Sequence, residues 1–295
     1  MNDIKAVVLA QEYIKAHHTD IEFSVENVCS AVGYSRRQVD RLFQKHMNIT
    51  LSEYINAVVL SESAEKLLNS DNSVIDVAFD SHYQSHEGYT RSFVKRFSIT
   101  PKEYRKRQIA IPIFTQHPVN HYYILKEGQA MDTTTICTVT PVNRPKRKLI
   151  YLTSKSATDY LSYCEEVGCD WEGLLNSIHE KFDTAALIDL PDSLQQKGIS
   201  KIAAGVEVPI DYKKTLPDGY EVAELPECVM LYFQSEPYDN LDDFGKYIGQ
   251  VFKAIENYNF ERYGYKYATS IAPTLNLGAE PEIGARIAIP VESIK

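Results

Sequence analysis

The 295-residue sequence contains no long hydrophobic run, and its purely apolar stretches are only a few residues long. A helix that crosses a bilayer needs about 20 apolar residues, so we expect no membrane partner. Asp3 and Lys5 lie where a signal peptide has its apolar segment, which predicts a cytoplasmic protein. The five cysteines are odd in number and scattered, so we expect reduced thiols and no disulfide framework.

Motifs of catalytic and cofactor sites are also missing. The sequence contains neither GxxxxGK nor GxGxxG, which cradle phosphates, and no GxSxG nucleophile motif. His82 and His86, and likewise His117 and His121, are spaced like metal ligands, but no cysteine or carboxylate cluster completes a four-ligand set. We therefore expect no metal, no cofactor and no catalytic residue, and a protein that is not an enzyme.

Basic residues are unevenly distributed along the chain. Residues 1–110 hold 14 basic and 14 acidic residues, whereas residues 111–295 hold 17 and 26, which accounts for the whole net charge of −9. Within the first part, the basic residues cluster at 36–45 and 91–107. Such clusters are typical of a phosphate-binding face. The change in charge also predicts a domain boundary near residue 110.

The first hundred residues contain an internal repeat. Residues 41–54 align with residues 91–104 at an offset of fifty, and seven of the fourteen pairs are identical. Upstream the offset is 49, where Ser24 aligns with Ser73. Each copy has the pattern of a serine-capped helix, a short turn and a second helix, which is the outline of a helix-turn-helix. A helical segment at residues 54–68 is expected to join the copies.

The two copies differ at the turn. In the first copy, Gly33 supplies the left-handed backbone that a tight turn needs, and Ser35 with Gln38 forms the capping box of the next helix. In the second copy, His82 lies in the turn, where a positive φ is tolerated only at some cost. The second turn is therefore expected to be less stable or differently shaped.

The second helix of each copy has an apolar side for the core and a polar side for the outside. In the first copy, Val39, Leu42 and Phe43 follow helical spacing, which leaves guanidinium, carboxylate and amide groups outside. Those groups match the base edges of the DNA major groove, and a solvated charged face is the alternative for one isolated helix. The repeat favours two reading helices about 34 Å apart, one turn of B-DNA. The residues predicted to bind DNA are Arg36, Arg37, Gln38, Asp40, Arg41 and Lys45 in the first copy and His86, Glu87, Gly88, Thr90, Arg91 and Lys95 in the second.

Several segments resemble the signature of AraC/XylS-type transcription regulators. They are residues 73–78, Ser-Val-Ile-Asp-Val-Ala, residues 89–97, Tyr-Thr-Arg-Ser-Phe-Val-Lys-Arg-Phe, and residues 100–105, Thr-Pro-Lys-Glu-Tyr-Arg. Residues 117–122, His-Pro-Val-Asn-His-Tyr, resemble the segment after this domain in the Rob, MarA and SoxS group. The resemblance implies double-stranded promoter DNA and RNA polymerase as partners. It also implies base contacts by Arg37, Asp40, Arg41, His86, Glu87, Gly88 and Arg91.

The sequence departs from that group at three places. His82 lies where glycine is usual, Glu87 and Gly88 replace a glutamine and a polar residue, and Asn56 lies where arginine is frequent. Because glutamate prefers cytosine or repels phosphate, the operator is expected to differ from that of the group. The first copy is expected to read bases and the second mainly to anchor the protein.

Beyond Pro112 the sequence changes character. Further prolines at 118, 141 and 145 predict a connecting region. Residues 149–154 are then echoed 81 residues later by residues 230–235, and each segment is followed by a helical pattern and another strand. This predicts an α+β domain made of a duplicated strand-helix-strand unit with a central cleft. Strands are expected at residues 133–139, 148–153, 202–208 and 286–291.

Parts of this region resemble the GyrI-like effector-binding domain. They are Tyr151, residues 232–238, Tyr-Phe-Gln-Ser-Glu-Pro-Tyr, and residues 286–291, Arg-Ile-Ala-Ile-Pro-Val, although Arg286 and Ala288 depart from the usual pattern. The resemblance implies a small-molecule effector held between two halves.

Composition favours an aromatic and acidic pocket in the same region. Fourteen of the twenty tyrosines and the only tryptophan lie after residue 110, together with 26 acidic residues. Aromatic faces and a carboxylate suit an aromatic or lipophilic cation, although for any single tyrosine a half-buried surface position is the better interpretation. The residues predicted to bind the effector are Tyr151, Trp171, Glu207, Tyr232, Phe233, Tyr247 and Glu282.

The sequence thus predicts a multidomain protein. An all-α DNA-binding domain with two helix-turn-helix units is expected at residues 1–110, a linker at 111–130, and a GyrI-like small-molecule-binding domain at 131–295. The predicted function is transcription regulation controlled by an effector. The alternative is a protein that sequesters or hydrolyses a small molecule and binds DNA only secondarily.

Overall fold

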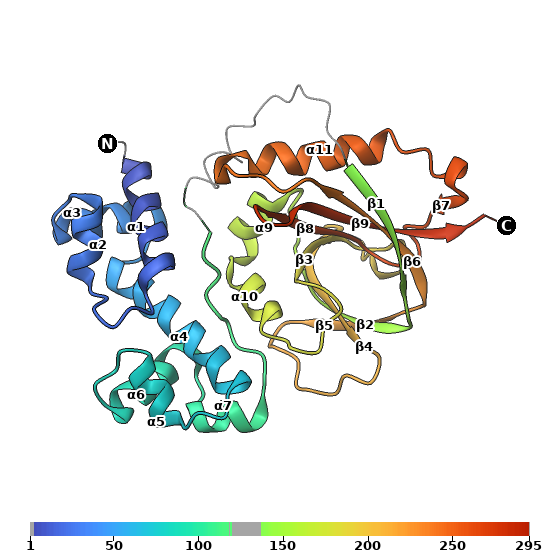
Figure 1. Ribbon diagram of the computed structural model, residues 1–295. Coiled ribbons are helices and arrows are strands. Elements are labelled where there is room, and N and C mark those ends of the chain that lie inside the picture. The colour runs from blue at the N-terminus through green and yellow to red at the C-terminus, as the bar shows by residue number, and fades with distance from the viewer. Residues whose placement is uncertain (1–2, 118, 120–136, 295) are drawn as a thin grey trace. The chain divides into compact units, whose positions relative to one another are not determined.

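The computed structural model describes residues 3–117, 119 and 137–294, and the chain divides into two compact units, Met1–Tyr123 and Ile124–Lys295 (Figure 1). The first unit is built from helices and the second from a sheet with helices, which confirms the helical first region and the sheet-containing second region expected from the sequence. Among the described residues, no helix has both the length and the hydropathy needed to cross a membrane.

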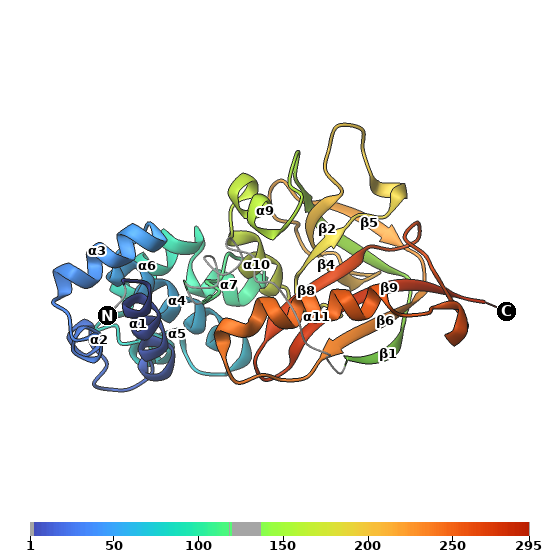
Figure 2. The same ribbon diagram turned by 90° about the horizontal axis from the view of Figure 1, so that it is seen from above.

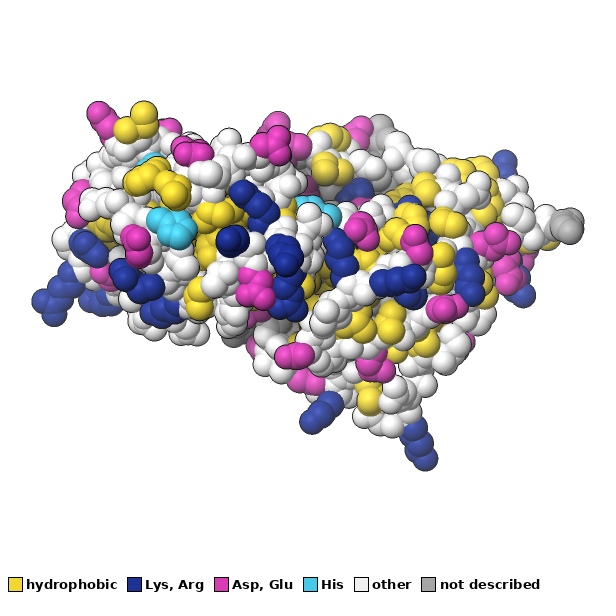
Figure 3. Space-filling view, turned by 90° about the horizontal axis from the view of Figure 1, so that it is seen from below, with side chains coloured by type: hydrophobic (Ala, Val, Ile, Leu, Met, Phe, Trp, Pro, Cys, Tyr) yellow, Lys and Arg dark blue, Asp and Glu magenta, His cyan; other side chains and the backbone are white. Residues whose placement is uncertain are grey.

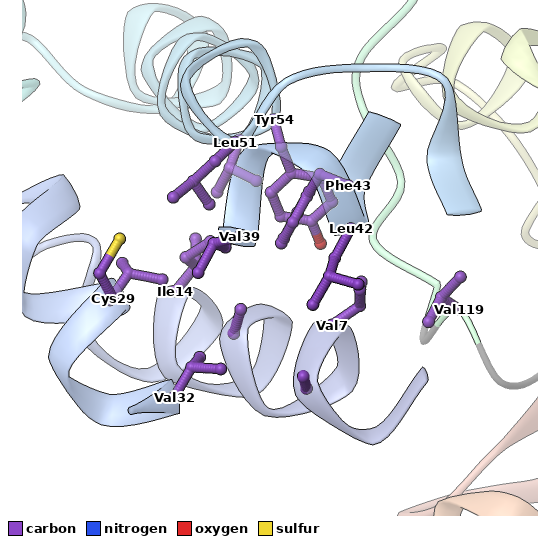
Figure 4. Close-up of a cluster of buried hydrophobic side chains, with 14 residues drawn as sticks. Val7, Ile14, Cys29, Val32, Val39, Leu42, Phe43, Leu51, Tyr54 and Val119 are labelled. Carbon is purple, nitrogen blue, oxygen red and sulfur yellow. The ribbon is translucent and has the colours of Figure 1, made fainter. Parts of the chain in front are cut away.

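The first unit is organised around one long helix, α4 (Leu51–Asn69). Its beginning packs in an apolar cluster with Phe43 (Figure 4), and its end packs in a second cluster with Phe93. The joining helix expected between the two copies is therefore confirmed. The other helices of this unit are α1 (Asp3–His17), α2 (Val25–Val32), α3 (Arg36–Met47), α5 (Val74–Asp80), α6 (His86–Phe97) and α7 (Pro101–Arg107).

Helices α4 and α5 (Val74–Asp80) each begin with a capping box. Thr50 Oγ1 accepts a hydrogen bond from Glu53 N at 3.2 Å, and Ser73 Oγ accepts one from Asp76 N at 3.1 Å. The carboxylates reciprocate, because Thr50 N donates to Glu53 at 2.8 Å and Ser73 N donates to Asp76 at 3.0 Å. These bonds hold the pKa of both carboxyl groups below the usual range. The hydroxyls of Ser24, Ser85 and Thr100 cap α2, α6 and α7.

The helical unit continues past residue 110. Phe114 N donates to Ser61 Oγ at 2.7 Å, and Val119 N donates to Gln11 Oε1 at 2.8 Å. The segment predicted as a linker, 111–130, therefore begins as part of the first unit. Most of its remainder lies outside the described residues.

Ser98 ends α6 with a left-handed backbone, at a φ of 57°. A residue with a Cβ atom pays about 1–2 kcal/mol for this conformation, and glycine avoids that cost. We expect Ser98→Gly to stabilise the first domain by about 0.5–1 kcal/mol, since the greater freedom of glycine in the unfolded chain offsets part of the gain. Thermal unfolding followed by far-UV circular dichroism measures the change. Ser98→Ala is the matched control and should bring no gain, and a lower stability of Ser98→Gly would contradict the prediction.

The described residues of the second unit, 137–294, contain one antiparallel sheet of nine strands. Its strands are β1 (Cys137–Arg144), β2 (Arg147–Thr153), β3 (Ala186–Asp189), β4 (Ile202–Pro209), β5 (Glu221–Leu225), β6 (Cys228–Ser235), β7 (Tyr265–Tyr267), β8 (Thr274–Glu280) and β9 (Gly284–Ser293). Its α-helices are α9 (Tyr160–Val167), α10 (Asp170–Asn176) and α11 (Phe244–Glu256). Helix α11 packs on β6, β8 and β9 and runs across them (Figure 2).

The strand order shows how the sheet is assembled. It runs β1-β6-β9-β8-β3-β4-β2-β5, with β7 paired to β9. One half contains β2, β4 and β3, the other contains β6, β9 and β8, and β3 pairs with β8 at the junction. Strand β1 precedes β2 in the chain but pairs with β6, and β5 precedes β6 but pairs with β2. The strand that precedes the first half, β1, therefore becomes the outer strand of the second half, and the strand that precedes the second half, β5, becomes the outer strand of the first.

The first strand of this unit extends further than the sequence pattern predicts. Of the strand predicted at 133–139, residues 137–139 belong to β1, and residues 133–136 lie outside the described residues. Strand β1 runs on to Arg144 and includes Pro141, which was expected in the connecting region. Because β1 lies at the edge of the sheet, a residue without an N–H can be accommodated there. The short strand β3 and the strand β8 are not anticipated by the sequence pattern.

Candidate nucleic-acid interface and ligand site

The turn between α2 and α3 depends on Gly33. Its φ is 75°, and its N–H donates to the Cys29 carbonyl at 3.0 Å, which ends α2. The predicted glycine turn is therefore confirmed. Helix α3 begins after Ser35, whose N and Oγ both donate to Gln38 Oε1, at 3.0 and 2.7 Å. The Gln38 side chain, predicted to contact DNA, is thus engaged in starting the helix.

The outer side of α3 carries four basic side chains. Arg36 Nη2 donates to a serine hydroxyl of α4 at 3.1 Å, and Lys45 Nζ pairs with Asp3 at 2.8 Å, so both are tied to neighbouring helices. Arg37 and Arg41 are exposed, and neither forms a hydrogen bond or ion pair with another described residue. These two arginines are therefore the side chains of α3 most available to an external partner.

Asp40 is half-buried at the junction of α3 and α4. Its Oδ1 accepts a hydrogen bond from Leu51 N at 3.2 Å, and its Oδ2 lies 3.9 Å from Arg36 Nε. The first bond satisfies an N–H group at the start of α4 that has no partner within the helix. The side chain predicted to contact cytosine thus also holds α3 to α4, which leaves one oxygen for a base.

The turn of the second copy has the backbone conformation that the sequence led us to expect. His82 has a φ of 62°, in the left-handed region. Its Nε2 lies 2.7 Å from the carbonyl oxygen of His18, which follows α1. This contact compensates part of the cost of the left-handed backbone and ties the second turn to the end of α1.

Helix α6 presents a surface of mixed charge. Four of the residues predicted there are exposed and form no hydrogen bond or ion pair within the described part of the chain, namely His86, Glu87, Arg91 and Lys95. The other two are half-buried. Gly88 N donates to Ser85 Oγ at 3.1 Å, and Thr90 Oγ1 is turned away from solvent. The exposed set combines two basic side chains with one carboxylate, so its net positive charge is lower than that of Arg37 and Arg41 on α3.

Other basic residues of the first unit have structural roles. Arg105 Nε donates to the Leu67 carbonyl at 2.8 Å, and Arg96 Cζ lies 5.8 Å from the centre of the Phe114 ring.

On the face of the molecule in Figure 3, lysine and arginine side chains are interspersed with acidic ones and form no continuous basic surface. Residues 1–110 contain equal numbers of basic and acidic residues, so attraction of phosphate depends on local groups rather than on a general excess of charge.

Three of the residues predicted to bind an effector lie on the same face of the sheet, opposite α11. They are Tyr151, Glu207 and Tyr232. The two tyrosines belong to one apolar cluster with Leu149 and Met230 and are only 4% and 9% exposed. Burial raises the pKa of Tyr232, so its hydroxyl stays protonated. The centre of this face is packed, and the open cleft expected there is corrected to a cluster formed by side chains of both halves.

The other four predicted residues are not brought to this face. Adjacent residues of a strand point to opposite sides of the sheet, so Phe233 lies on the face covered by α11 and Tyr232 lies on the other face. The Phe233 ring lies 5.0 Å from that of Tyr258. Trp171 is buried in α10, Tyr247 lies on α11, and Glu282 is exposed in the turn between β8 and β9. The seven predicted residues therefore do not form one pocket.

Glu207 is not the unpaired carboxylate that a cationic ligand would need. It is 4% exposed, its Oε1 lies 2.7 Å from Arg147 Nε, and its Oε2 lies 3.4 Å from Arg144 Nε. Arg147 is completely buried, and its Nη1 donates to the Pro226 carbonyl at 2.8 Å. Sequence reasoning missed both arginines, since no local pattern links either of them to a glutamate so far along the chain.

Comparison with known proteins concerns the first unit. A family model described as a helix-turn-helix domain matches residues 28–107. The chain is 31% identical to the multiple antibiotic resistance protein MarA of Escherichia coli K12 over 99 residues, 34% of this chain and 78% of MarA. It is 35% identical to the transcriptional regulator Rob of Salmonella typhimurium over 89 residues, 30% of this chain and 31% of Rob.

Further relatives follow the same pattern. YkgA of Escherichia coli K12 is 36% identical over 84 residues, 28% of this chain and 35% of YkgA, so the chain spans about a third of the length of YkgA and of Rob. Among solved structures, an AraC-type DNA-binding protein from Chromobacterium violaceum is 23% identical, with a TM-score of 0.33 over 35% of this chain and 91% of that one.

Proposed function

Because the chain belongs to the family of helix-turn-helix transcription regulators that includes MarA and Rob, the AraC family, we propose that it binds promoter DNA through α3 and α6. The observation that carries this proposal is the pair of second helices, each preceded by a turn and each with arginine on its outer side. Arg37 and Arg41 on α3 and Arg91 on α6 are exposed. A guanidinium in the major groove can donate two hydrogen bonds to guanine.

The two helices have different roles in this proposal. Helix α3 has two available arginines and reads bases, whereas α6 combines Arg91 and Lys95 with Glu87 and mainly contacts phosphate. The two half-sites are expected about 34 Å apart, one turn of B-DNA. RNA polymerase is proposed as a further partner, in keeping with a transcription regulator.

The second unit is proposed to bind a small-molecule effector, as a GyrI-like domain without catalytic activity. Two observations support this, the assembly of its sheet from two corresponding halves and the polar cluster buried on the face opposite α11. An effector changes regulation only if it binds two states of the protein with different affinity. The ligand is therefore expected to favour one DNA-binding state.

The test of the DNA-binding proposal begins with selection of bound DNA from a random pool. Arg41→Ala and Arg91→Ala are then each expected to weaken retardation of the selected fragment about tenfold to a hundredfold, since one arginine contact contributes about 1–3 kcal/mol. Arg41→Ala should also relax base preference, whereas Arg91→Ala should weaken all sequences alike. Lys15→Ala, which removes an exposed cation on α1 outside both basic clusters, is the matched control. Retardation that survives both arginine changes would refute the proposal.

A further inference from the structure

Three arginines and two carboxylates meet on the face of the sheet opposite α11. They are Arg144, Arg147 and Arg286 with Asp183 and Glu207. Glu207 is shared by Arg147 and Arg144, as described above. Asp183, which precedes β3, is shared by Arg144 and Arg286. Its Oδ2 lies 3.8 Å from Arg144 Nη2, and its Oδ1 lies 3.2 Å from Arg286 Nη1. The cluster therefore has one more positive charge than negative charges.

The excess charge does not fall on Arg147. Its Nε lies 2.7 Å from Glu207, its Nη1 donates to Pro226 O at 2.8 Å, and its Nη2 donates to Cys228 Sγ at 3.4 Å. Each nitrogen of this guanidinium thus has a partner, although Nε meets Glu207 as a close ion pair and not as an aligned hydrogen bond. The excess positive charge falls on Arg144 and Arg286. These two guanidiniums share Asp183, and Arg144 also shares Glu207 with Arg147.

Arg144 and Arg286 keep hydrogen-bond donors without acceptors among the described residues. A guanidinium has five N–H donors. The Nη2 of Arg144 donates to the Tyr232 hydroxyl, but its Nε is buried without an aligned acceptor and its Nη1 has none. Only the Nη1 of Arg286 has an acceptor, which is Asp183. Because the side chains are 10% and 17% exposed, water compensates these donors only in part.

Apolar groups lie next to these donors. Arg144 Cζ lies 5.3 Å from the centre of the Phe182 ring and 5.5 Å from that of Tyr232. A surface opening of about 660 Å³ borders Arg144, together with Cys228 and Ile271, and the exposed carboxylates of Glu227 and Glu292 also line it. A ligand that combines one anionic group with a small apolar body would find partners for both parts here.

We propose that Arg144 and Arg286 bind a small carboxylate anion with an apolar or aromatic body. This inference rests on the proposed effector function of the second unit and names the chemical class of the effector. A carboxylate offers the two acceptors that a guanidinium fork matches, and its single charge balances the excess of the cluster. It is opposite in charge to the lipophilic cation expected from composition, because both carboxylates of this cluster are already paired with arginine.

Benzoate, benzamide and benzamidinium test the charge of the ligand, since they are similar in shape but anionic, neutral and cationic. The full-length protein is unfolded by heat with each compound at millimolar concentration, and Trp171 fluorescence follows the second unit. Benzoate is expected to raise the midpoint saturably, and benzamide and benzamidinium to leave it unchanged. No shift with benzoate overturns the proposal, and so does a shift with benzamidinium alone, which would indicate a cation site.

Two substitutions with opposite expected effects test the residues. Arg286→Met should weaken benzoate binding about tenfold or more, because hydrogen bonds to a charged group are lost. Asp183→Asn should tighten it, because it removes the competing carboxylate, and a purely structural role of Asp183 would not produce tighter binding. The exposed Arg262→Met is the matched control. If Arg286→Met does not fold, Asp183→Asn decides, and unchanged benzoate affinity in that variant overturns the proposal.

DNA retardation measured without benzoate separates this inference from the proposed function. If benzoate has no effect while Arg41→Ala still weakens retardation, the anion site is wrong and the DNA-binding proposal stands. If benzoate behaves as expected but Arg41→Ala and Arg91→Ala change nothing, the ligand site stands and the DNA-binding proposal fails.

Discussion

Replacing Arg147 with methionine is expected to lower the free energy of unfolding of the second unit by about 3–5 kcal/mol. Arg147 is completely buried, and its Nε is 2.7 Å from Glu207 Oε1. Methionine fills much of the same volume but leaves Glu207 with only the more distant Arg144, and it leaves the Pro226 carbonyl without its donor. A buried carboxylate that loses its closest cation keeps its desolvation cost and loses the compensating attraction.

Trp171 makes this measurement specific, since it is the only tryptophan and lies in the second unit. Urea unfolding followed by its fluorescence gives the change in free energy. The matched control is Lys146→Met, which breaks an ion pair with Glu224 in which the side chains are 62% and 58% exposed, and it should cost less than about 1 kcal/mol. Adding Glu207→Gln to Arg147→Met should restore part of the loss. A loss below about 1 kcal/mol for Arg147→Met would show that the buried pair contributes little.

Phe93→Ala is expected to destabilise the first unit by about 3–5 kcal/mol. The Phe93 ring is completely buried, with centroids 4.7 Å from Phe97 and 5.6 Å from Tyr89. Removing it leaves a cavity between α4 and α6 that neighbouring rings fill only in part. Since α6 is positioned by this cluster, DNA retardation should weaken together with stability.

Far-UV circular dichroism follows the loss of helix in this variant. Val94→Ala, at the next and partly exposed position, is the matched control and should change stability little. The transition reported by Trp171 should keep its midpoint, because the apolar cluster around Phe93 contains only residues of the first unit. A Phe93→Ala protein with unchanged stability would show that the cluster repacks around the missing ring.

The first unit could be predicted largely from sequence because its determinants are local. The box of Ser73 and Asp76 and the left-handed turn at Gly33 each involve residues close together in the chain. Helical spacing correctly separated the buried Phe43 from the exposed Arg41. What local patterns could not show is that Gln38 and Asp40 are partly used to hold helix starts in place.

The ligand site of the second unit could be predicted only in part. Neighbouring aromatic residues were assigned to one pocket, but Tyr232 and Phe233 alternate across the sheet and face different layers. The number of acidic residues indicated an acidic pocket, although a count does not reveal which carboxylates are paired. The pairing of Glu207 with Arg147 depends on strand register between distant segments, which composition does not contain.

The exchange of outer strands between the two halves of the sheet constrains how this unit is made. A chain leaving the ribosome exposes β1 long before β6, its strand partner in the described part of the sheet, has been synthesised. Strand β5 can pair with β2 as soon as it is synthesised, so the first half completes its outer edge early. At that stage β1 is still unpaired, because β6 has not yet been made. Such delayed, long-range pairing slows folding and leaves an unpaired edge open to aggregation in the meantime. Production of the halves as separate fragments should therefore yield insoluble chains unless both are present together.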